Sequence, residues 1–308
     1  MVSIVIYIFS KHNTIVIFLF FFNKWMASVV VINQDDTNKN NTTNDKTMNG
    51  LEEFVSGKGA DTNDKEYDSI EDMWKAELAD GTWYTKAEDW YINNCPTTVD
   101  GVLGGFGKLD PLDVAESCTF LIQLFKLTGH QLKTGKCLDC GAGIGRVTKN
   151  LLSKFFLTSD LLESNQRLIN EALNFVDHNV RGKLICNTLQ DFIPNENEYD
   201  CIWIQWVVIY LTDDDFVLFL KRCVKSLKPN GFIVIKENVM SPNAVHNFLV
   251  DKDDSSVTRS DNIMRNIFHK AGLKIVKVEK QKNFPSNMFP VLSYALKPVE
   301  EDNEVKTF

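Results

Sequence analysis

The sequence predicts an α/β protein built on a mainly parallel sheet whose two faces are covered by helices. From residue 136 onward, short apolar runs of strand length alternate with longer amphipathic segments of helical period. The first run leads through Asp139 into a turn with glycines at 141, 143 and 145, and a helix follows. The last two runs are expected to be joined by a short loop, which predicts an antiparallel hairpin at one edge.

This alternation can be followed element by element. The stretch Lys-Pro-Asn-Gly at 228–231 ends one expected helix, and Gly272 is a typical stop for the next. Strands are expected at 136–141, 159–163, 183–189, 199–207, 231–238, 274–281 and 290–298, and helices at 145–155, 165–176, 214–227 and 260–272. The strand–helix order therefore predicts a layered sheet protein.

Helices are also expected ahead of this alternation. Ile70, Met73, Trp74 and Leu78 recur at helical spacing, and a second, aromatic-rich helix follows. We expect Trp74 to pack in the core and ordered structure to begin near Asp64. We expect an apolar leader with a disordered polar tail at residues 1–63 and a helical cover at 64–115. The α/β domain is expected at 116–300 and an acidic tail at 301–308.

The N-terminal segment allows three interpretations. Two strongly apolar runs are interrupted by Lys11, His12 and Asn13, so neither run is long enough to span a bilayer as a helix. The segment is a signal peptide, a poor membrane anchor, or translated sequence upstream of a start at Met26. We favour the last, because nothing downstream is typical of a secreted protein. Residues 33–46 are almost wholly polar and are expected to be disordered.

Composition limits the classes of function. The chain has 308 residues and 44% hydrophobic content, enough for one large domain with an extension. Its net charge of −8 argues against non-specific nucleic-acid binding, which needs a basic surface. The seven cysteines are scattered and odd in number, so we expect reduced, buried thiols in an intracellular protein. The sequence carries no signal for oligomeric state, and a monomer is the default expectation.

The glycine turn indicates which ligand the sheet binds. Gly141, Gly143 and Gly145 give G-x-G-x-G, and a dinucleotide site would have its third glycine where Arg146 stands. A phosphate-binding P-loop would need Gly-Lys-Ser/Thr, which the turn lacks. An acid, Glu163, ends the next strand. This combination favours S-adenosylmethionine, held by a turn whose residues lack Cβ atoms.

The strand ends supply candidate contacts for that cofactor. Glu163 can accept hydrogen bonds from ribose hydroxyls, and Arg146 can pair with a carboxylate, although a solvated helix-start arginine is the alternative. Leu189 and Gln190 follow the third strand, where the adenine is expected. Gln205 and Trp206 end the fourth strand over the point of methyl transfer. Core packing is the alternative role of Trp206.

Longer stretches resemble one family, the eukaryotic protein N-terminal methyltransferases that modify the α-amine of X-Pro-Lys proteins. The matching stretches are PTTVDGVLGGFG from Pro96, LDCGAGIGRVTK from Leu138, LQDF from Leu189, YDCIWIQWV from Tyr199, LKPNGFIVIKEN from Leu227 and DDSSVTRS from Asp253. The resemblance implies a seven-stranded, Rossmann-like class I methyltransferase sheet with an N-terminal helical extension and a substrate-binding hairpin insertion. It also implies S-adenosyl-L-methionine as cofactor, X-Pro-Lys N-termini as partners, and location in cytoplasm and nucleus.

Site residues carry over from that resemblance position by position. It implies that the cofactor contacts are Gly141, Gly143, Arg146, Glu163, Leu189, Gln190 and Gln205, with Trp90 and Tyr91 as an aromatic pair that closes the site. The implied substrate contacts are Leu103, Gly104, Trp206, Asp251 and Ser256, and the implied catalytic residues are Asp254, Tyr210 and Asn238. The pair at Trp90 stands in swapped order relative to the common family pattern.

The implied chemistry needs a proton acceptor. An α-amine has a pKa of about 8 and is largely protonated at neutral pH, and only the neutral amine attacks a methyl group. A carboxylate can accept that proton, and Asp254 is the candidate. Two positions depart from the family pattern, because Tyr210 replaces the usual His and Phe289 replaces a common Tyr. The alternatives are a small-molecule methyltransferase and a weakly active or silent N-terminus-binding homologue.

Overall fold

The computed structural model describes residues 4–11, 14–21, 28–33, 57–129 and 135–299. Met26, most of the polar tract at 33–46 and the acidic tail at 301–308 lie outside the described residues, so those predictions remain untested. The chain divides into two compact units, Met1–Glu52 and Glu53–Phe308.

The first unit contains a three-stranded antiparallel sheet. Its strands are β1 (Ile4–Lys11), β2 (Thr14–Phe21) and β3 (Ser28–Asn33), in the order β1-β2-β3. The three segments are rich in Val, Ile and Phe, which favour strands. Among the described residues, no helix combines the length and apolarity that a membrane span requires.

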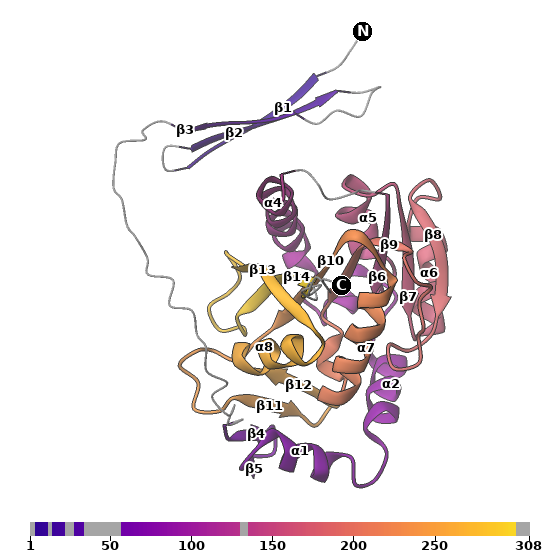
Figure 1. Ribbon diagram of the computed structural model, residues 1–308, viewed down its shortest axis with the longest axis vertical. Coiled ribbons are helices and arrows are strands. Elements are labelled where there is room, and N and C mark those ends of the chain that lie inside the picture. The colour runs from indigo at the N-terminus through magenta and orange to yellow at the C-terminus, as the bar shows by residue number, and fades with distance from the viewer. Residues whose placement is uncertain (1–3, 12–13, 22–27, 34–56, 130–134, 300–308) are drawn as a thin grey trace, which may run out of the picture. The chain divides into compact units, whose positions relative to one another are not determined.

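The second unit is organised around a seven-stranded sheet, which confirms the predicted fold class (Figure 1). Five neighbouring strands run parallel, the next strand β14 runs antiparallel to them, and the edge strand β13, antiparallel to β14, again has the direction of the five. In sheet order the strands are β13 (Leu273–Lys280), β14 (Val291–Pro298), β10 (Leu227–Asn238), β9 (Tyr199–Gln205), β6 (Lys136–Cys140), β7 (Thr158–Glu163) and β8 (Arg181–Cys186). The predicted edge pair is present, but β13 and β14 are joined by the long segment 281–290.

Helices cover both faces of this sheet. On one face lie α4 (Asp110–Leu127) and α5 (Arg146–Asn150), which pack around Trp203, and α6 (Gln166–Phe175), which packs around Leu161. On the other face lie α7 (Asp213–Ser226) and α8 (Asp261–Lys270). Thr212 caps the N-terminus of α7 and Ser260 that of α8. In each case the side-chain hydroxyl accepts a backbone N–H of the first helical turn.

The helix expected at 145–155 is interrupted. After α5 the backbone of Leu151 leaves the helical region, and a short 3₁₀ helix, η2 (Leu152–Lys154), follows. The break places both Leu151 and Leu152 in the core. Burial of two adjacent leucines thus takes precedence over the helical propensity of the segment.

A cover precedes the sheet in the sequence, and it comprises α1 (Ile70–Glu77), α2 (Trp83–Asn94), α3 (Val99–Val102) and the 3₁₀ helix η1 (Gly107–Leu109). The boundary expected at 115/116 falls inside α4, because that helix runs from the cover onto the sheet. Trp74 is half-buried and packs edge-on against Trp83, with ring centroids 5.0 Å apart.

A second, four-stranded sheet contains the predicted hairpin. The hairpin strands β11 (Phe248–Asp251) and β12 (Ser256–Arg259) lie between β10 and α8 in the sequence. They are joined by β4 (Gly59–Asp61) and β5 (Glu66–Tyr67), in the order β12-β11-β4-β5. We expected ordered structure to begin near Asp64. Regular structure in this unit begins earlier, at Gly59.

Candidate active site

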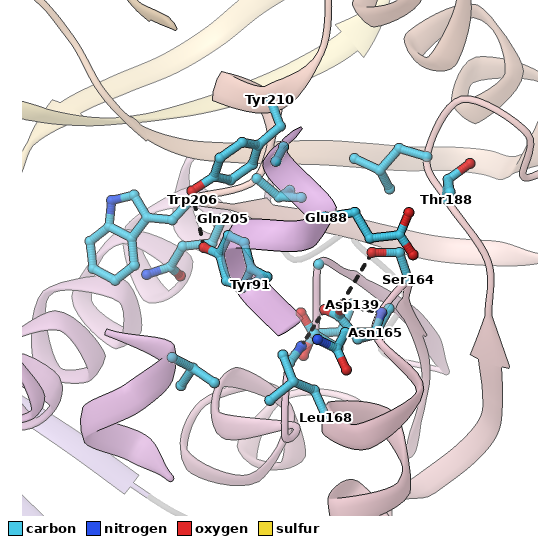
Figure 2. A pocket seen from close by; sticks show the side chains of 18 of the residues that line it. Glu88, Tyr91, Asp139, Ser164, Asn165, Leu168, Thr188, Gln205, Trp206 and Tyr210 are labelled. Atoms are coloured by element: carbon cyan, nitrogen blue, oxygen red, sulfur yellow. Dashed lines mark hydrogen bonds between the residues drawn. The ribbon is translucent and has the colours of Figure 1, made fainter. Parts of the chain in front are cut away.

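The candidate site is a pocket at the carboxyl ends of β6, β7 and β9, beneath α2 (Figure 2). Strand order reverses between β6 and β9, since the chain goes from β6 outward to β7 and β8 and then returns to β9. Such a reversal leaves a crevice outside the strand ends. The pocket lies where this rule places a ligand site.

The glycine turn forms one wall of the pocket. Gly141, Gly143 and Gly145 have φ of +66°, +56° and +82°, in the left-handed region that favours glycine. A Cβ on Gly141 would lie 2.6 Å from a Val207 side-chain atom, and one on Gly145 would lie 2.3 Å from Val176. We expected the missing Cβ atoms to admit a ligand. The structure shows that backbone conformation and protein packing already require glycine.

Glu163 and its neighbours form a polar corner of the pocket. The backbone N–H groups of Gly143 and Asn165 donate to the two Glu163 oxygens, at 2.9 and 2.8 Å. Burial raises the pKa of Glu163 above its ordinary value, and these hydrogen bonds oppose the rise. The Nδ2 of Asn165 is buried and finds no hydrogen-bond partner within the described part of the chain. Acceptors with spare lone pairs beside a free donor suit a pair of ligand hydroxyls.

Leu189 and Gln190 lie along the pocket after β8, as predicted. The Arg222 guanidinium of α7 donates to both of their carbonyl oxygens, at 2.7 and 2.8 Å. These two hydrogen bonds fix the backbone of the segment that contains Leu189 and Gln190. Sequence spacing gave no indication of Arg222, because it lies about 30 residues away in the chain.

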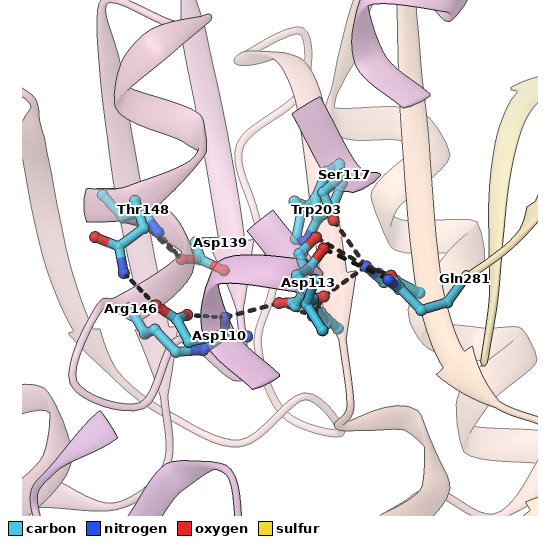
Figure 3. Close-up of polar contacts among 12 residues, drawn as sticks. Asp110, Asp113, Ser117, Asp139, Arg146, Thr148, Trp203 and Gln281 are labelled. Carbon is cyan, nitrogen blue, oxygen red and sulfur yellow. Dashed lines mark hydrogen bonds and ion pairs between the residues drawn. The ribbon is translucent and has the colours of Figure 1, made fainter. Parts of the chain in front are cut away.

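Arg146 reaches the pocket from a buried ion-pair network (Figure 3). Its guanidinium lies 2.7 Å from both Asp110 and Asp113 of α4. Only 4% of Arg146 is exposed, which excludes a solvated helix-start residue. Its first function is therefore to join α5 to α4, and any ligand carboxylate would meet a cation already paired with two acids.

Gln205 belongs to the same network. Its amide nitrogen donates to both oxygens of Asp113, at 2.9 Å, and its oxygen accepts from the Trp203 indole at 2.9 Å. Lys236 of β10 also contacts Asp113, with Nζ 2.5 Å from Oδ1. Gln205 lines the pocket, but its polar groups are largely committed to the protein.

Trp206 stands in a strained conformation at the end of β9. Its φ is +52°, which is rare for a bulky side chain, and its N–H is held by the carbonyl of Lys236 at 3.1 Å. The indole lines the pocket and stacks with the Arg146 guanidinium, 5.6 Å from the ring centroid. Such strain is commonly retained at functional positions. Core packing is therefore not the main role of Trp206.

A row of hydroxyls connects the pocket with the hairpin. Tyr210, in the 3₁₀ helix η3 (Val208–Tyr210), donates from its hydroxyl to Asp254 Oδ2 at 3.3 Å. The Tyr91 hydroxyl lies 3.0 Å from the Tyr210 hydroxyl (Figure 2). Because Tyr210 has one proton and gives it to Asp254, Tyr91 is the donor to Tyr210. Burial raises the pKa of both tyrosines above 10, so they remain protonated.

Asp254 is the acid at the end of this row. Burial raises its pKa above the ordinary value, and the nearby Asp251 carboxylate adds to the rise. Hydrogen bonds from Ser256 and Tyr210 oppose it. Asp254 Oδ1 is buried and has no hydrogen-bond partner among the described residues. Asp254 is thus held through one oxygen while the other remains available.

One face of α2 forms the roof of the pocket. Tyr84, Ala87, Glu88 and Tyr91 line it at helical spacing of i, i+3, i+4 and i+7. Trp90 lies off this stripe and instead packs its ring edge-on against Tyr91, with centroids 5.3 Å apart. The pocket lining contains Tyr91 but not Trp90, so the expected aromatic pair contributes one member directly.

Other predicted residues lie beside the pocket rather than in its lining. Val102 reaches the glycine turn, whereas its neighbours Leu103 and Gly104 are half-buried and exposed. Asn238 ends β10 opposite Val291. Phe289 is 40% exposed on the segment before β14. The lining residues that the sequence analysis did not single out are Tyr84, Ala87, Glu88, Val102, Ala142, Val147, Ser164, Asn165, Leu168, Thr188, Val207 and Leu211.

Glu237 is a further acid that the sequence did not indicate. It is 1% exposed, and burial raises its pKa to about 8. One oxygen accepts the Asn238 N–H at 2.9 Å, and the other has no partner in the described structure. The backbone N–H groups of Asn238, Val207 and Val208 oppose this rise in the pKa. The cysteines are a separate matter. All seven are free, and most are buried, as the sequence predicted; Cys186 is exposed.

Sheet order, glycine turn and the acid at the end of β7 together define a class I S-adenosylmethionine-dependent methyltransferase. Residues 79–297 match the family model described as AdoMet dependent proline di-methyltransferase. Because this match covers most of the chain, the protein belongs to that family.

Relatives and a solved structure agree with this assignment. The chain is 42% identical over 249 residues to an alpha N-terminal protein methyltransferase of Dictyostelium discoideum, covering 77% of this chain and 90% of the relative. It is 40% identical over 218 residues to a human N-terminal Xaa-Pro-Lys N-methyltransferase, covering 70% and 95%. A SAM-dependent methyltransferase structure from Leishmania major superposes with a TM-score of 0.73 at 41% identity, covering 80% of this chain and 99% of that one.

Proposed function

We propose that this protein transfers methyl groups from S-adenosylmethionine to the α-amino group of proteins that begin X-Pro-Lys. The proposal rests on one observation above all. Tyr210, which lines the cofactor pocket, donates to Asp254, which belongs to the hairpin. A cofactor site is thereby joined to a carboxylate that can serve an incoming amine. The names of the relatives supply the substrate class.

The residues around the pocket fit this cofactor. Glu163 and Asn165 offer acceptors and a free donor for ribose hydroxyls, and the backbone at Leu189 and Gln190 offers an edge for the adenine. Arg146, which also lines the pocket, would hold the methionine carboxylate. When bound, the cofactor supplies an electrophilic methyl group on a sulfonium. All other steps fall to the chain's own residues.

Asp254 is the proton acceptor in this proposal. The α-amine, with a pKa of about 8, must lose a proton before its lone pair is free. Asp254 Oδ1 can accept that proton, because Oδ2 is already held by Tyr210. Its raised pKa makes it a better base near neutral pH than an exposed aspartate. Asp251, in the same hairpin, can attract the cationic side chain at the third substrate position.

The test is mass spectrometry of a Ser-Pro-Lys peptide after incubation with the protein and S-adenosylmethionine. Wild type should add methyl increments at the α-amine. Asp254→Asn should lower kcat by about 10²-fold or more while it retains cofactor binding, since general-base contributions are of that order. Transfer to small metabolites but not to the peptide would favour a small-molecule methyltransferase. Peptide binding without transfer would indicate a silent recognition protein.

A further inference from the structure

We propose that β4, β5 and α1, residues 59–77, form an N-terminal clamp that positions the substrate hairpin, and that Glu77 is its positioning residue. The inference rests on the proposed function, because the hairpin carries Asp251 and Asp254. It assigns a role to a segment that lies before residue 79, where the family match begins. The argument uses backbone pairing, one ion pair and one close packing contact.

The backbone of the clamp extends the hairpin sheet. β4 pairs in parallel with β11, with Ala60 opposite Leu249. Thr62 N–H donates to the Val250 carbonyl at 2.9 Å, and Asn247 N–H donates to the Lys58 carbonyl at 2.8 Å. These bonds convert β11 from an edge strand into an inner strand of the sheet. The strand that leads to Asp251 is thereby held on both sides.

Side chains fasten the turn of the hairpin to α1. Lys252 forms an ion pair with Glu77, whose side chain is only 8% exposed. The Tyr67 hydroxyl donates to the other Glu77 oxygen at 2.7 Å, and Thr62 Oγ1 accepts the Lys252 N–H at 3.0 Å. Lys252 follows Asp251 directly and precedes Asp254 by two residues. A shift of Lys252 therefore moves both acids.

Close packing fixes the distance between clamp and hairpin. A Cβ on Gly59 would lie 2.2 Å from the ring of Phe248, so the β4 backbone lies directly on that ring. Tyr67 packs against Phe248 as well, with ring centroids 6.3 Å apart. Phe248 is fully buried. The hairpin cannot slide along the clamp without disrupting this contact.

The clamp is separate from the cofactor pocket. No residue from 59 to 77 is among the described residues that line the pocket, which begin with Tyr84. Loss of the clamp should therefore weaken peptide use and leave cofactor binding intact. This separation distinguishes a positioning role from a general contribution to folding.

The experiment compares Glu77→Leu, Glu77→Gln and Lys252→Met in the full chain. Glu77→Leu and Lys252→Met should each lower kcat/KM for a Ser-Pro-Lys peptide about tenfold, and their effects should not add, because both remove one interaction. Glu77→Gln keeps an acceptor and should retain most activity. The matched control is Asp68→Asn, which removes an exposed ion pair with Lys58 in the same segment. It should leave all parameters unchanged.

Two further measurements decide the outcome. Calorimetry should give cofactor affinity within twofold of wild type in Glu77→Leu and Lys252→Met. Hydrogen–deuterium exchange should become faster over residues 247–259 and remain unchanged over 137–150. Unchanged peptide kinetics, or an equal loss of cofactor affinity, would overturn the clamp. If wild type fails to methylate the peptide, the proposed function fails, and the exchange measurement alone decides on the clamp. If Glu77→Leu does not fold, Lys252→Met makes the same comparison.

Discussion

At the scale of single residues, Tyr210 is the most informative position. The family resemblance implies a histidine there, and a tyrosine with a raised pKa cannot replace it as a base near neutrality. Its hydroxyl nevertheless holds Asp254 through Oδ2. In the proposed mechanism, therefore, Asp254 accepts the proton and the Tyr210 phenol orients that carboxylate.

Tyr210→Phe should alter the pH dependence of catalysis. The Tyr210 hydrogen bond lowers the pKa of Asp254, so its removal raises that pKa further. Asp254 must be ionised to act, hence the acidic limb of the kcat/KM profile should move to higher pH. At pH 7 the rate should fall about tenfold, as expected when a hydrogen bond to a charged group is lost. Tyr210→His should instead raise the rate at pH 7. An unshifted limb in Tyr210→Phe would contradict this role of Tyr210.

Glu237 predicts a pH dependence of stability. Its pKa is raised from 4.5 to about 8, so the folded state binds this proton more tightly than the unfolded state. Its stabilising contribution is complete below pH 4.5 and is lost as pH rises towards 8. Glu237→Gln mimics the neutral acid, so the variant should lose less stability than wild type as the pH rises from 5 to about 8. Thermal unfolding between pH 5 and about 8.5 measures it, and parallel curves for variant and wild type would refute the assignment.

At the scale of elements, the glycine turn distinguishes two costs of a side chain. Gly141→Ala adds a Cβ at positive φ and also 2.6 Å from Val207, so the turn must shift and cofactor affinity should fall more than about tenfold. Gly129→Ala provides the matched control, because its φ is +64° and no atom of the described residues lies within 4 Å of the added Cβ. The control should lose about 1–2 kcal/mol of stability and keep cofactor affinity. Calorimetry and thermal unfolding test both, and equal affinities would contradict a sterically constrained turn.

Elements also show how far the sequence could be interpreted. Short apolar runs located the sheet strands, and longer segments of helical period located α1, α2, α6, α7 and α8. It could not locate β4, since Gly59–Asp61 is too short to carry a period and becomes a strand only by pairing with β11. The resemblance indicated Trp90 and Tyr91 together, yet helical geometry admits only Tyr91 to the pocket.

The same limit applies to the site. Gly141, Glu163 and Trp206 were predictable, because each stands at a strand end of a parallel sheet. Glu237 and Arg222 were not, since their roles depend on backbone groups brought near them by folding. Arg146 was assigned to a ligand, and only the structure reveals its two protein acids.

At the scale of the whole molecule, one buried network connects the cover with the sheet. Asp113 of α4 accepts from Arg146 of α5 (Figure 3). It also accepts from Gln205 of β9 and from Lys236 of β10. Lys236 is 1% exposed, and its Nζ also contacts Ser117 Oγ at 2.8 Å. Burial lowers the pKa of Lys236, whereas Asp113 favours its charged form. The acid is therefore the shared counter-ion of two buried cations.

Asp113→Asn should consequently destabilise the protein by about 3–5 kcal/mol, because it leaves buried charges without their counter-ion. Denaturant unfolding measures the change. Lys86→Ala, which removes an exposed ion pair with Asp80, serves as the control and should leave the midpoint unchanged. Since the network also fixes Arg146 and Gln205 at the pocket wall, cofactor affinity should fall along with stability. If cofactor affinity fell while the free energy of unfolding stayed unchanged, Asp113 would contribute to ligand binding alone and not to the packing of the cover on the sheet.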